Sequence, residues 1–247
     1  MKKIAAIGAF LFLLLNANYA QEFRFGFQVS PNFTWMSSDD NRINGNGTNL
    51  GLKLGMLGEK YLDDDGRYAI VSGIGFAFNQ GGTLQHDIGG NFWPNSELSR
   101  PELNNNDNAL PDGVNLKYGL QFVEIPFALK MRTQEFGYIR YFVEIPRFVL
   151  GINTQAQGDI SGEGNVDTED ENINDDVNFF NFSWGIGGGL EYTINDNTAL
   201  VGGIFFQQGF LDLTDDAGRK ALGAGETVAE DSRGTISNIT IRIGVMF

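Results

Sequence analysis

Residues 235–247, the last thirteen of the chain, form the segment that most constrains the fold. From Ile239 to Phe247 every odd-numbered residue is apolar, whereas most even-numbered residues are polar or small. Because successive side chains of a strand point to opposite faces, this segment predicts a strand with one apolar face and one largely polar face. A transmembrane β-barrel is built from strands of this kind, with one face toward lipid and the other toward the lumen.

The same alternation starts near the other end of the chain. Residues 23–35 place aromatic and aliphatic side chains and one proline on the odd positions, without an exception. The even positions carry only polar, charged or glycine residues, namely Arg24, Gly26, Gln28, Ser30, Asn32 and Thr34. A strict period of two over this length indicates a half-buried strand. A soluble sandwich strand with this face would need a large partner sheet.

Six further segments complete a set of eight predicted strands. They cover residues 50–57, 68–78, 118–131, 136–151, 180–192 and 199–213. The connections between consecutive strands alternate long and short, and the first is long. An up-and-down barrel with both chain ends on one side gives this pattern. We therefore predict an all-β fold, an eight-stranded antiparallel up-and-down transmembrane β-barrel with four long outer loops and three short periplasmic turns.

Two of these strands contain the same five residues. Phe-Val-Glu-Ile-Pro occupies residues 122–126 and again residues 142–146. In each strand the apolar face changes parity near the glutamate, and the proline cannot donate a ladder hydrogen bond. Both facts predict a bulge or bend at these two places.

The first twenty residues have the features of a signal peptide. Lys2 and Lys3 precede an apolar run over residues 4–15, which is too short to span a bilayer as a helix, and Ala20 is a small residue at the expected cleavage position. We predict a signal peptide over residues 1–20 and a barrel domain over residues 21–247. The chain has no cysteine, which excludes lipid attachment through a thiol, disulfides and thiolate metal sites.

The charge of the chain is acidic and unevenly distributed. The formal net charge is −14, and it becomes −16 when Lys2 and Lys3 are removed. Such acidity argues against nucleic acid as a partner. The four long stretches, residues 37–47, 79–117, 152–177 and 212–234, hold 21 of the 31 acidic residues and 6 of the 17 basic ones. The predicted barrel wall is therefore nearly neutral, as a membrane-embedded body should be.

The mature sequence resembles the PorT-like outer-membrane β-barrel family of Bacteroidetes-type, Gram-negative bacteria over its whole length. The resemblance rests on the Phe25-Gly-Phe27 opening, the strand Val123-Glu-Ile-Pro-Phe-Ala-Leu-Lys130, the Gly185–Tyr192 strand and the terminal Phe247. It implies an eight-stranded outer-membrane protein, and it suggests an accessory role in protein secretion of the type IX kind. The acidic third loop and the second Val-Glu-Ile-Pro are particular to this chain.

An eight-stranded barrel has an interior just wide enough for side chains, so we expect a plugged lumen. The charged residues that we expect to face inward are Arg24, Lys53, Glu124, Lys130, Arg140, Glu144, Glu191 and Arg242. A turn near Gln134 would place Glu124 opposite Glu144 and Lys130 opposite Arg140. Two carboxylates at that distance need basic neighbours. We interpret the set as a lumenal ion-pair network.

The sequence offers little support for catalysis or for a metal site. Its single histidine, His86, precedes Asp87 in a predicted loop, where a lone histidine is most often solvated. The acidic residues 167–171 and 175–176 lack the spacing of an EF-hand, and we interpret them as a solvated, partly disordered loop rather than a Ca²⁺ site. We expect neither an enzyme nor a cofactor.

Two functional classes remain open. The first is a structural or interaction barrel at the cell surface, for example an accessory to protein secretion. The second is a narrow channel or transporter for small solutes. A soluble lipocalin-type barrel, with its apolar face inward, is a more distant third. The expected partners are outer-membrane lipid and lipopolysaccharide, a secretion or envelope protein, and the barrel assembly machinery. The machinery would read Ile241, Ile243, Val245 and Phe247 on the closing strand.

Overall fold

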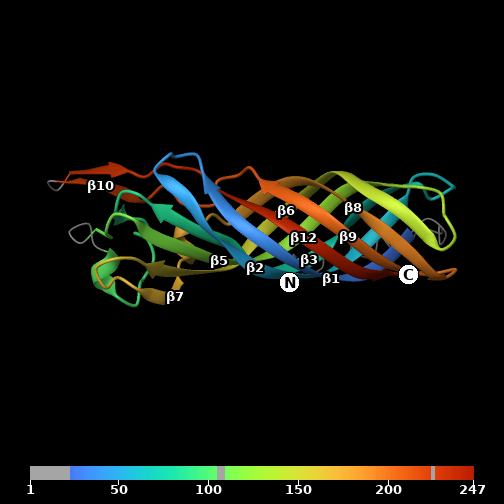
Figure 1. Cartoon of the computed structure of the whole chain (residues 1–247), viewed down its shortest axis with the longest axis horizontal. Helices are drawn as coiled ribbons and strands as arrows, with labels where there is room; N and C mark the ends of the chain where they lie inside the picture. Colours follow the sequence, from blue (N-terminus) through green and yellow to red (C-terminus); the bar gives the residue numbers. More distant parts are fainter. Residues whose placement is uncertain (1–22, 105–108, 224–225) are drawn as a thin grey trace, which may run out of the picture.

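The computed structural model describes residues 23–104, 109–223 and 226–247. The predicted signal peptide, residues 1–20, lies outside the described residues. Eight long antiparallel strands form a closed barrel (Figure 1). They are β1 (Phe23–Ser38), β2 (Ile43–Tyr61), β3 (Tyr68–His86), β5 (Val114–Arg132), β6 (Ile139–Ser161), β8 (Phe180–Asn195), β9 (Thr198–Gly209) and β12 (Gly234–Met246). The described residues include no helix that is long and apolar enough to cross a membrane.

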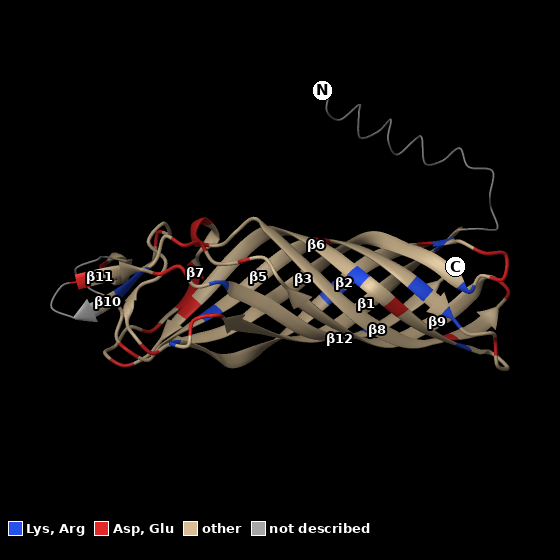
Figure 2. Cartoon of the chain, turned by 90° about the horizontal axis from the view of Figure 1, so that it is seen from above, with Lys and Arg blue, Asp and Glu red and all other residues tan. Residues whose placement is uncertain are grey.

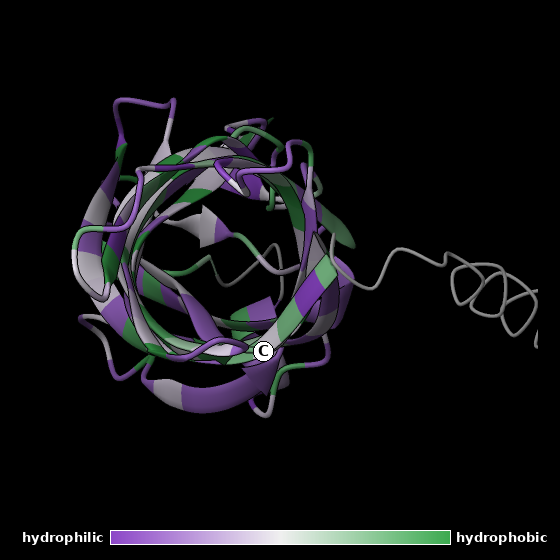
Figure 3. Cartoon of the chain, turned by 90° about the vertical axis from the view of Figure 1, so that its right-hand side faces the viewer, coloured by the Kyte–Doolittle hydropathy of each residue, from purple (hydrophilic) through white to green (hydrophobic). Residues whose placement is uncertain are grey.

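Each of these strands pairs with its neighbours in the chain, and the last strand returns to the first. β1 pairs with both β2 and β12, so the sheet closes on itself, as the end view shows (Figure 3). The pairing of Phe27 with Val245 and the backbone hydrogen bonds between Phe25 and Phe247 place the start of β1 and the end of β12 at the same rim. The predicted all-β, eight-stranded up-and-down barrel is confirmed.

The two ends of the barrel differ in their connections. Short connections at residues 62–67, 133–138 and 196–197 lie at the same end as residues 23 and 247, which we call the turn end. Long connections at residues 87–113, 162–179 and 210–233 lie at the opposite end, the loop end. The first predicted long loop, residues 37–47, is instead a four-residue turn at residues 39–42. β1 continues to Ser38 beside β12, and β2 already begins at Ile43 beside β3.

Small elements make up much of the loop end. The long connections contain β4 (Gly90–Asn91), β7 (Thr168–Asn172), β10 (Arg219–Gly223) and β11 (Glu226–Ala229). Two 3₁₀ turns, η1 (Pro101–Asn104) and η2 (Asn174–Asp176), lie in the same connections. β4, β10 and β11 form a separate three-stranded sheet, whereas β7 extends the barrel wall beside β6. Acidic residues concentrate in this region (Figure 2).

We call the part of the barrel near the turn end the belt half, because its outward side chains are almost all apolar. Phe27, Leu54, Phe76, Phe127 and Ile243 are examples, each more than a third exposed. The inward positions of the same strands carry mostly polar or charged residues or glycine, with small buried apolar clusters such as Phe142 with Phe205 and Leu57 with Val71. This is the arrangement that the alternation predicted, with the apolar face outside.

The loop half, residues 36–49, 79–104, 109–122, 153–178, 212–223 and 226–236, has the opposite arrangement. Its interior is a hydrophobic core in which Leu116, Leu120, Ala156 and Ile173 have no exposed surface. The connection between β3 and β5 adds Trp93 and other apolar side chains to this core. Polar side chains of β2, β3, β5 and β6 face outward here. Hence the strand that we predicted to start near residue 50 and those that we predicted to end near residues 78 and 151 in fact have a second, inverted segment.

The two Phe-Val-Glu-Ile-Pro strands change parity for different reasons. In β6, Ile145 and Pro146 together face the single residue Leu129 of β5 and the single residue Ile186 of β8, so the predicted bulge is present. In β5 the even-numbered side chains face inward along the whole strand, on both sides of Glu124. The apparent switch in β5 marks the border between the two halves, because the apolar side chains move from the inner face to the outer face. The predicted bend in β5 is therefore wrong.

Candidate functional site in the barrel interior

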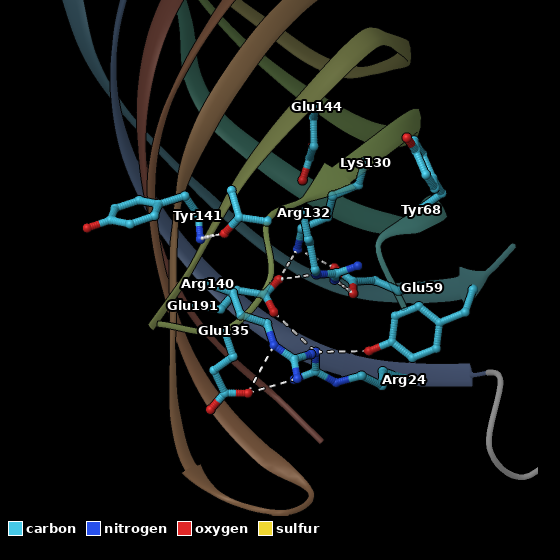
Figure 4. A network of polar contacts seen from close by, with 12 residues as sticks. Arg24, Glu59, Tyr68, Lys130, Arg132, Glu135, Arg140, Tyr141, Glu144 and Glu191 are labelled. Atoms are coloured by element: carbon cyan, nitrogen blue, oxygen red, sulfur yellow. Dashed lines mark hydrogen bonds and ion pairs between the residues drawn. The ribbon is translucent and has the colours of Figure 1, made fainter. Parts of the chain in front are cut away.

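A cluster of five charged side chains fills the lumen nearest the turn end (Figure 4). β2 contributes Glu59, β5 contributes Lys130 and Arg132, β8 contributes Glu191, and β1 contributes Arg24. Lys130 Nζ lies 2.5 Å from both Glu59 Oε1 and Glu191 Oε1. The side chains of Glu59, Lys130, Arg132 and Glu191 are at most 2% exposed.

Two arginines, Arg132 and Arg24, complete the ion pairs of this cluster. Arg132 pairs with Glu59 and places its Nε 3.0 Å from Glu191 Oε1. Arg24 Nη1 lies 3.2 Å from Glu191 Oε2 and donates to the Tyr61 hydroxyl at the same distance. Each carboxylate thus accepts from at least two cations. Burial of charge on this scale is tolerated only when every charge has such partners.

A second cluster lies deeper in the belt half and is centred on Glu144 of β6, which has no exposed surface. Arg242 Nη1 of β12 and Arg147 Nη1 of β6 lie 2.6 Å and 2.7 Å from its two oxygens. The Arg242 guanidinium also lies 3.8 Å from the centroid of the Phe205 ring, a cation–π contact. A side chain at the facing Gly187 would collide with that ring, since a Cβ there would lie 1.9 Å from Phe205.

A third layer connects the charged clusters to the loop half. Lys53 Nζ of β2 lies 2.8 Å from Glu124 Oε1 of β5 and 3.0 Å from Gln207 Oε1 of β9. Beyond it Asn32 donates to Gln80 at 2.7 Å, and the Thr34 hydroxyl donates to the Gly81 carbonyl. The hydrophobic core of the loop half follows directly. Side chains therefore occupy the interior from the first charged cluster to the loop end.

Seven of the eight residues that we expected to face inward take part in these layers. They are Arg24, Lys53, Glu124, Lys130, Glu144, Glu191 and Arg242. Arg140 instead lies at the rim of the turn end, where its side chain is a third exposed and pairs with Glu135 at 2.8 Å. The expected oppositions of Glu124 to Glu144 and of Lys130 to Arg140 are both wrong. In the β5–β6 ladder Lys130 lies opposite Glu144, and Glu124 lies opposite Gly151. The turn spans residues 133–138, and the bulge in β6 shifts the register further.

Three buried charged residues of the belt half were not among those predicted. Glu59 lies on the same inward face as Lys53, and Arg132 lies on the same inward face as Lys130. Extending each predicted strand by one or two residues would have included them. Arg147 follows the Ile145–Pro146 bulge, which moves it from the outward to the inward face. Alternation alone cannot place a residue beyond a bulge.

A cavity of about 760 Å³ opens at the turn end, below the first cluster. Its wall includes Arg24, Tyr61, Arg140 and Glu191, and Phe247 lies at its lip. Glu191 in this wall is paired on its other side with the buried Lys130 and Arg132. The cavity is the mouth of the barrel and does not continue into the loop half.

The residues considered for catalysis and for metal binding have structural surroundings. His86, expected to be solvated, is buried with its ring centroid 3.9 Å from that of Phe92, and burial lowers its pKa to about 3. Glu171 accepts a hydrogen bond from the backbone N–H of Ser99 at 2.7 Å, and Asp176 accepts one from that of Asn95 at 3.1 Å. These two carboxylates tie the connection at residues 87–113 to that at residues 162–179, so the acidic loop is ordered there. Within the described ranges no three His, Asp or Glu side chains gather as metal ligands would.

A family model described as "Outer membrane protein beta-barrel domain" matches residues 19–215, which is most of the chain. The chain belongs to this family. It is therefore an outer-membrane β-barrel protein, and the apolar belt of the belt half is its lipid-facing surface. No curated protein matches the sequence.

Several solved outer-membrane proteins are similar in structure at low sequence identity. Neisserial surface protein A is 10% identical, with a TM-score of 0.37 over 89% of this chain and 96% of that chain. The attachment invasion locus protein Ail of Yersinia pestis is 11% identical, with a TM-score of 0.35 over 92% and 100%. The outer membrane protease OmpT from Escherichia coli is 6% identical, with a TM-score of 0.40 over 92% and 96%.

Proposed function

We propose that this protein is a sealed barrel that anchors a folded loop half at the cell surface, where it acts as a structural or interaction protein. The filled interior carries this proposal. An ion crossing the barrel would have to displace the paired charges around Glu144 and Lys130, which are at most 1% exposed, and then pass an apolar core. Desolvation opposes both steps strongly.

The competing function is a narrow channel or transporter for small solutes. Recording purified protein in planar bilayers distinguishes the two, with a general porin as the positive control. We expect no steady openings in either polarity. Regular unitary currents from the intact chain would contradict the proposal and favour the channel.

The orientation that we propose places the loop end outside the cell and both chain ends in the periplasm. Long loops on the outside and short turns on the periplasmic side are the usual arrangement of such barrels. Since the chain has no cysteine, single substitutions can report orientation cleanly. Glu169→Cys at the loop end and Asp64→Cys at the turn end are both exposed positions. On intact cells, a membrane-impermeant maleimide should label the first and not the second, and the reverse would invert the orientation.

An accessory role in protein secretion is the finer form of this function, and it rests on the PorT-like resemblance of the Glu-Ile-Pro strand. The loop half offers a protein partner a folded surface that is held by β2, β3, β5 and β6. Comparing the secreted proteins of a deletion strain with those of a strain complemented by the full chain tests this role. Unchanged secretion would contradict the accessory role, but it would not contradict the proposal of a sealed membrane anchor. We expect no enzymatic activity.

A further inference from the structure

A polar groove of about 230 Å³ lies on the outer surface of the loop half, away from the lumen. Two neighbouring outward-facing pairs of β5 and β6 form its floor, namely Lys117 with Asp159 and Gly119 with Gln157. Asn79 of β3 borders it on one side and Asp170 of β7 on the other. Four strands thus contribute to one small depression.

Gly119 creates the depression. A Cβ built at this position would meet only Asn79 Oδ1 at 3.4 Å and the Gln157 carbonyl at 3.7 Å, which are ordinary contacts. Its φ is not in the left-handed region either. Neither packing nor backbone geometry therefore requires glycine here. What the missing side chain leaves is open space between polar neighbours.

The polar groups around this space are held in place by the protein. Lys117 Nζ lies 2.7 Å from Asp159 Oδ2, and Asp159 Oδ1 accepts from the backbone N–H of Asp170 at 3.0 Å. The Asn79 side chain donates to the Leu50 carbonyl at 3.0 Å, and its backbone has φ of 53°, a conformation that L-residues rarely adopt. In the described part of the chain, the Gln157 amide and the Asp170 carboxylate have no side-chain partner, so both are free to bind a ligand.

The groove lies next to the apolar belt. Along β3, Asn79 directly follows Phe78, an exposed belt residue. On β5 and β6, the outward pair Gln121 and Gln155 follows toward the belt, and the apolar pair Val123 and Ile152 comes directly after it. Since the belt contacts the hydrocarbon of the membrane, the groove opens at the level of the lipid headgroups.

We propose that this groove binds one sugar unit of a glycolipid headgroup in the outer leaflet, as in lipopolysaccharide. Amides and carboxylates around a small space suit a ligand rich in hydroxyl groups, which both donate and accept hydrogen bonds. Lys117, Asp159 and Asp170 give the groove a formal charge of −1, which disfavours a phosphate. Its volume is below the ~300–1,000 Å³ of sites for drug-sized ligands, so it accommodates one ring. The choice of a membrane lipid rests on the proposed orientation, whereas the affinity for a sugar does not.

Calorimetric titration of the full barrel in detergent with lipid-free core oligosaccharide, released from rough lipopolysaccharide, tests the proposal. We expect saturable binding that Gly119→Val weakens by at least about tenfold, because the new side chain fills the groove. Gln157→Ala should weaken it by about 2- to 10-fold through the loss of one hydrogen bond. The matched control is Gly202→Val, an outward glycine of β9 whose Cβ would meet no atom within 4 Å, and it should bind like the wild type.

Two results would overturn the proposal. One is no binding of the oligosaccharide, or binding that Gly119→Val leaves intact while the variant keeps the shift in gel mobility of a folded barrel on boiling. The other is equal binding of maltohexaose, which would make the groove a site for free glucans rather than headgroups. Both are measured in solution, so they are independent of the cysteine labelling that tests orientation.

Discussion

The two halves of this barrel share the same strands but have opposite interiors. In the belt half the lumen is filled by ion pairs and the outer face is apolar, whereas in the loop half the interior is apolar and the outer face is polar. β5 crosses the border without a bulge, and its even-numbered side chains face inward throughout. In β5 the inversion therefore results only from a change in which positions, even or odd, carry the apolar residues. The solvent around each half decides which face must be apolar: lipid around one, water around the other.

This comparison predicts that the largest single effect lies in the interior of the belt half. Glu144→Gln leaves Arg147 and Arg242 buried with no carboxylate between them. We expect the free energy of unfolding to fall by roughly 3–5 kcal/mol, as for other broken buried pairs. Urea unfolding in lipid vesicles, followed by tryptophan fluorescence, measures it. The control is Glu135→Gln at the rim, where the pair with Arg140 is about a third exposed and should cost less than about 1 kcal/mol.

The loop half should instead depend on close apolar packing. Leu120 of β5 has no exposed surface, and Leu120→Ala should cost about 2–5 kcal/mol through lost burial and a cavity. The outward-facing Thr83→Ala should stay within about 0.5 kcal/mol. Hydrogen exchange would show where the cost falls. If the amides of the belt half lose protection as much as those of the loop half, the two halves unfold as one unit rather than as the separate layers that the inversion suggests.

A smaller effect should follow from an ion pair at the loop end. Lys220 Nζ of β10 lies 2.5 Å from Asp40 Oδ2 in the turn between β1 and β2. Its hydrogen bond lowers the pKa of Asp40, and although burial alone would lower the pKa of Lys220, Asp40 and Glu230 raise it. The stabilisation from Asp40 is therefore present above its usual carboxyl range and is lost as pH falls through the lowered pKa. That from Lys220 is lost as pH rises through the raised one.

Lys220→Met should remove this stabilisation, about 1 kcal/mol at neutral pH, and with it the acid limb of the pH dependence. The readout is the hydrogen-exchange protection of residues 219–223 at neutral and acid pH. Protection that falls in acid to the same extent in wild type and variant would mean that another carboxylate controls this segment.

The last prediction concerns His86, whose main effect appears in acid rather than at neutral pH. Since burial lowers its pKa to about 3, the ring is neutral in the folded protein and would be charged in the unfolded chain below its usual value of 6.5. Its contribution to stability is therefore lost as pH falls from 6.5 toward 3. His86→Phe should change the free energy of unfolding by less than about 1.5 kcal/mol at pH 7 and remove this acid loss. A variant that loses stability in acid as steeply as the wild type would show that His86 is accessible to water.

The sequence predicts the belt half well and the loop half poorly. Alternation over residues 23–35 and 239–247 predicts the strands, their outward faces and the barrel. With lipid outside and polar groups inside, the odd positions are apolar and the even positions are polar or small. In residues 79–86 and 153–161 the apolar residues keep the even positions of the preceding belt segments, but bulges at Asn79 and Thr154 turn those positions inward. Few residues there are large and apolar, and Leu84 and Ile160 stand alone among polar and small neighbours. These segments therefore look aperiodic and were interpreted as loops.

The interior ion pairs show the same limit. Their residue types and most of their positions follow from inward parity, as for Arg24, Lys130 and Glu191. Their partners depend on register, which the Ile145–Pro146 bulge and the length of the turn at residues 133–138 determine. The polar groove depends further on β7, whose place beside β6 results from a connection that carries no repeating pattern.

The continuity of β2, β3, β5 and β6 across the border also bears on how long the loop half persists on a cell. A transmembrane strand needs about 9–11 residues, and these four have 19 to 23, so the remainder carries the loop half as part of the same hydrogen-bonded wall. Proteases cut chains at exposed, loosely held segments, and these strands present none where they leave the lipid. Shedding of the loop half would therefore require unzipping the barrel itself, which ties the lifetime of the surface structure to that of its membrane anchor.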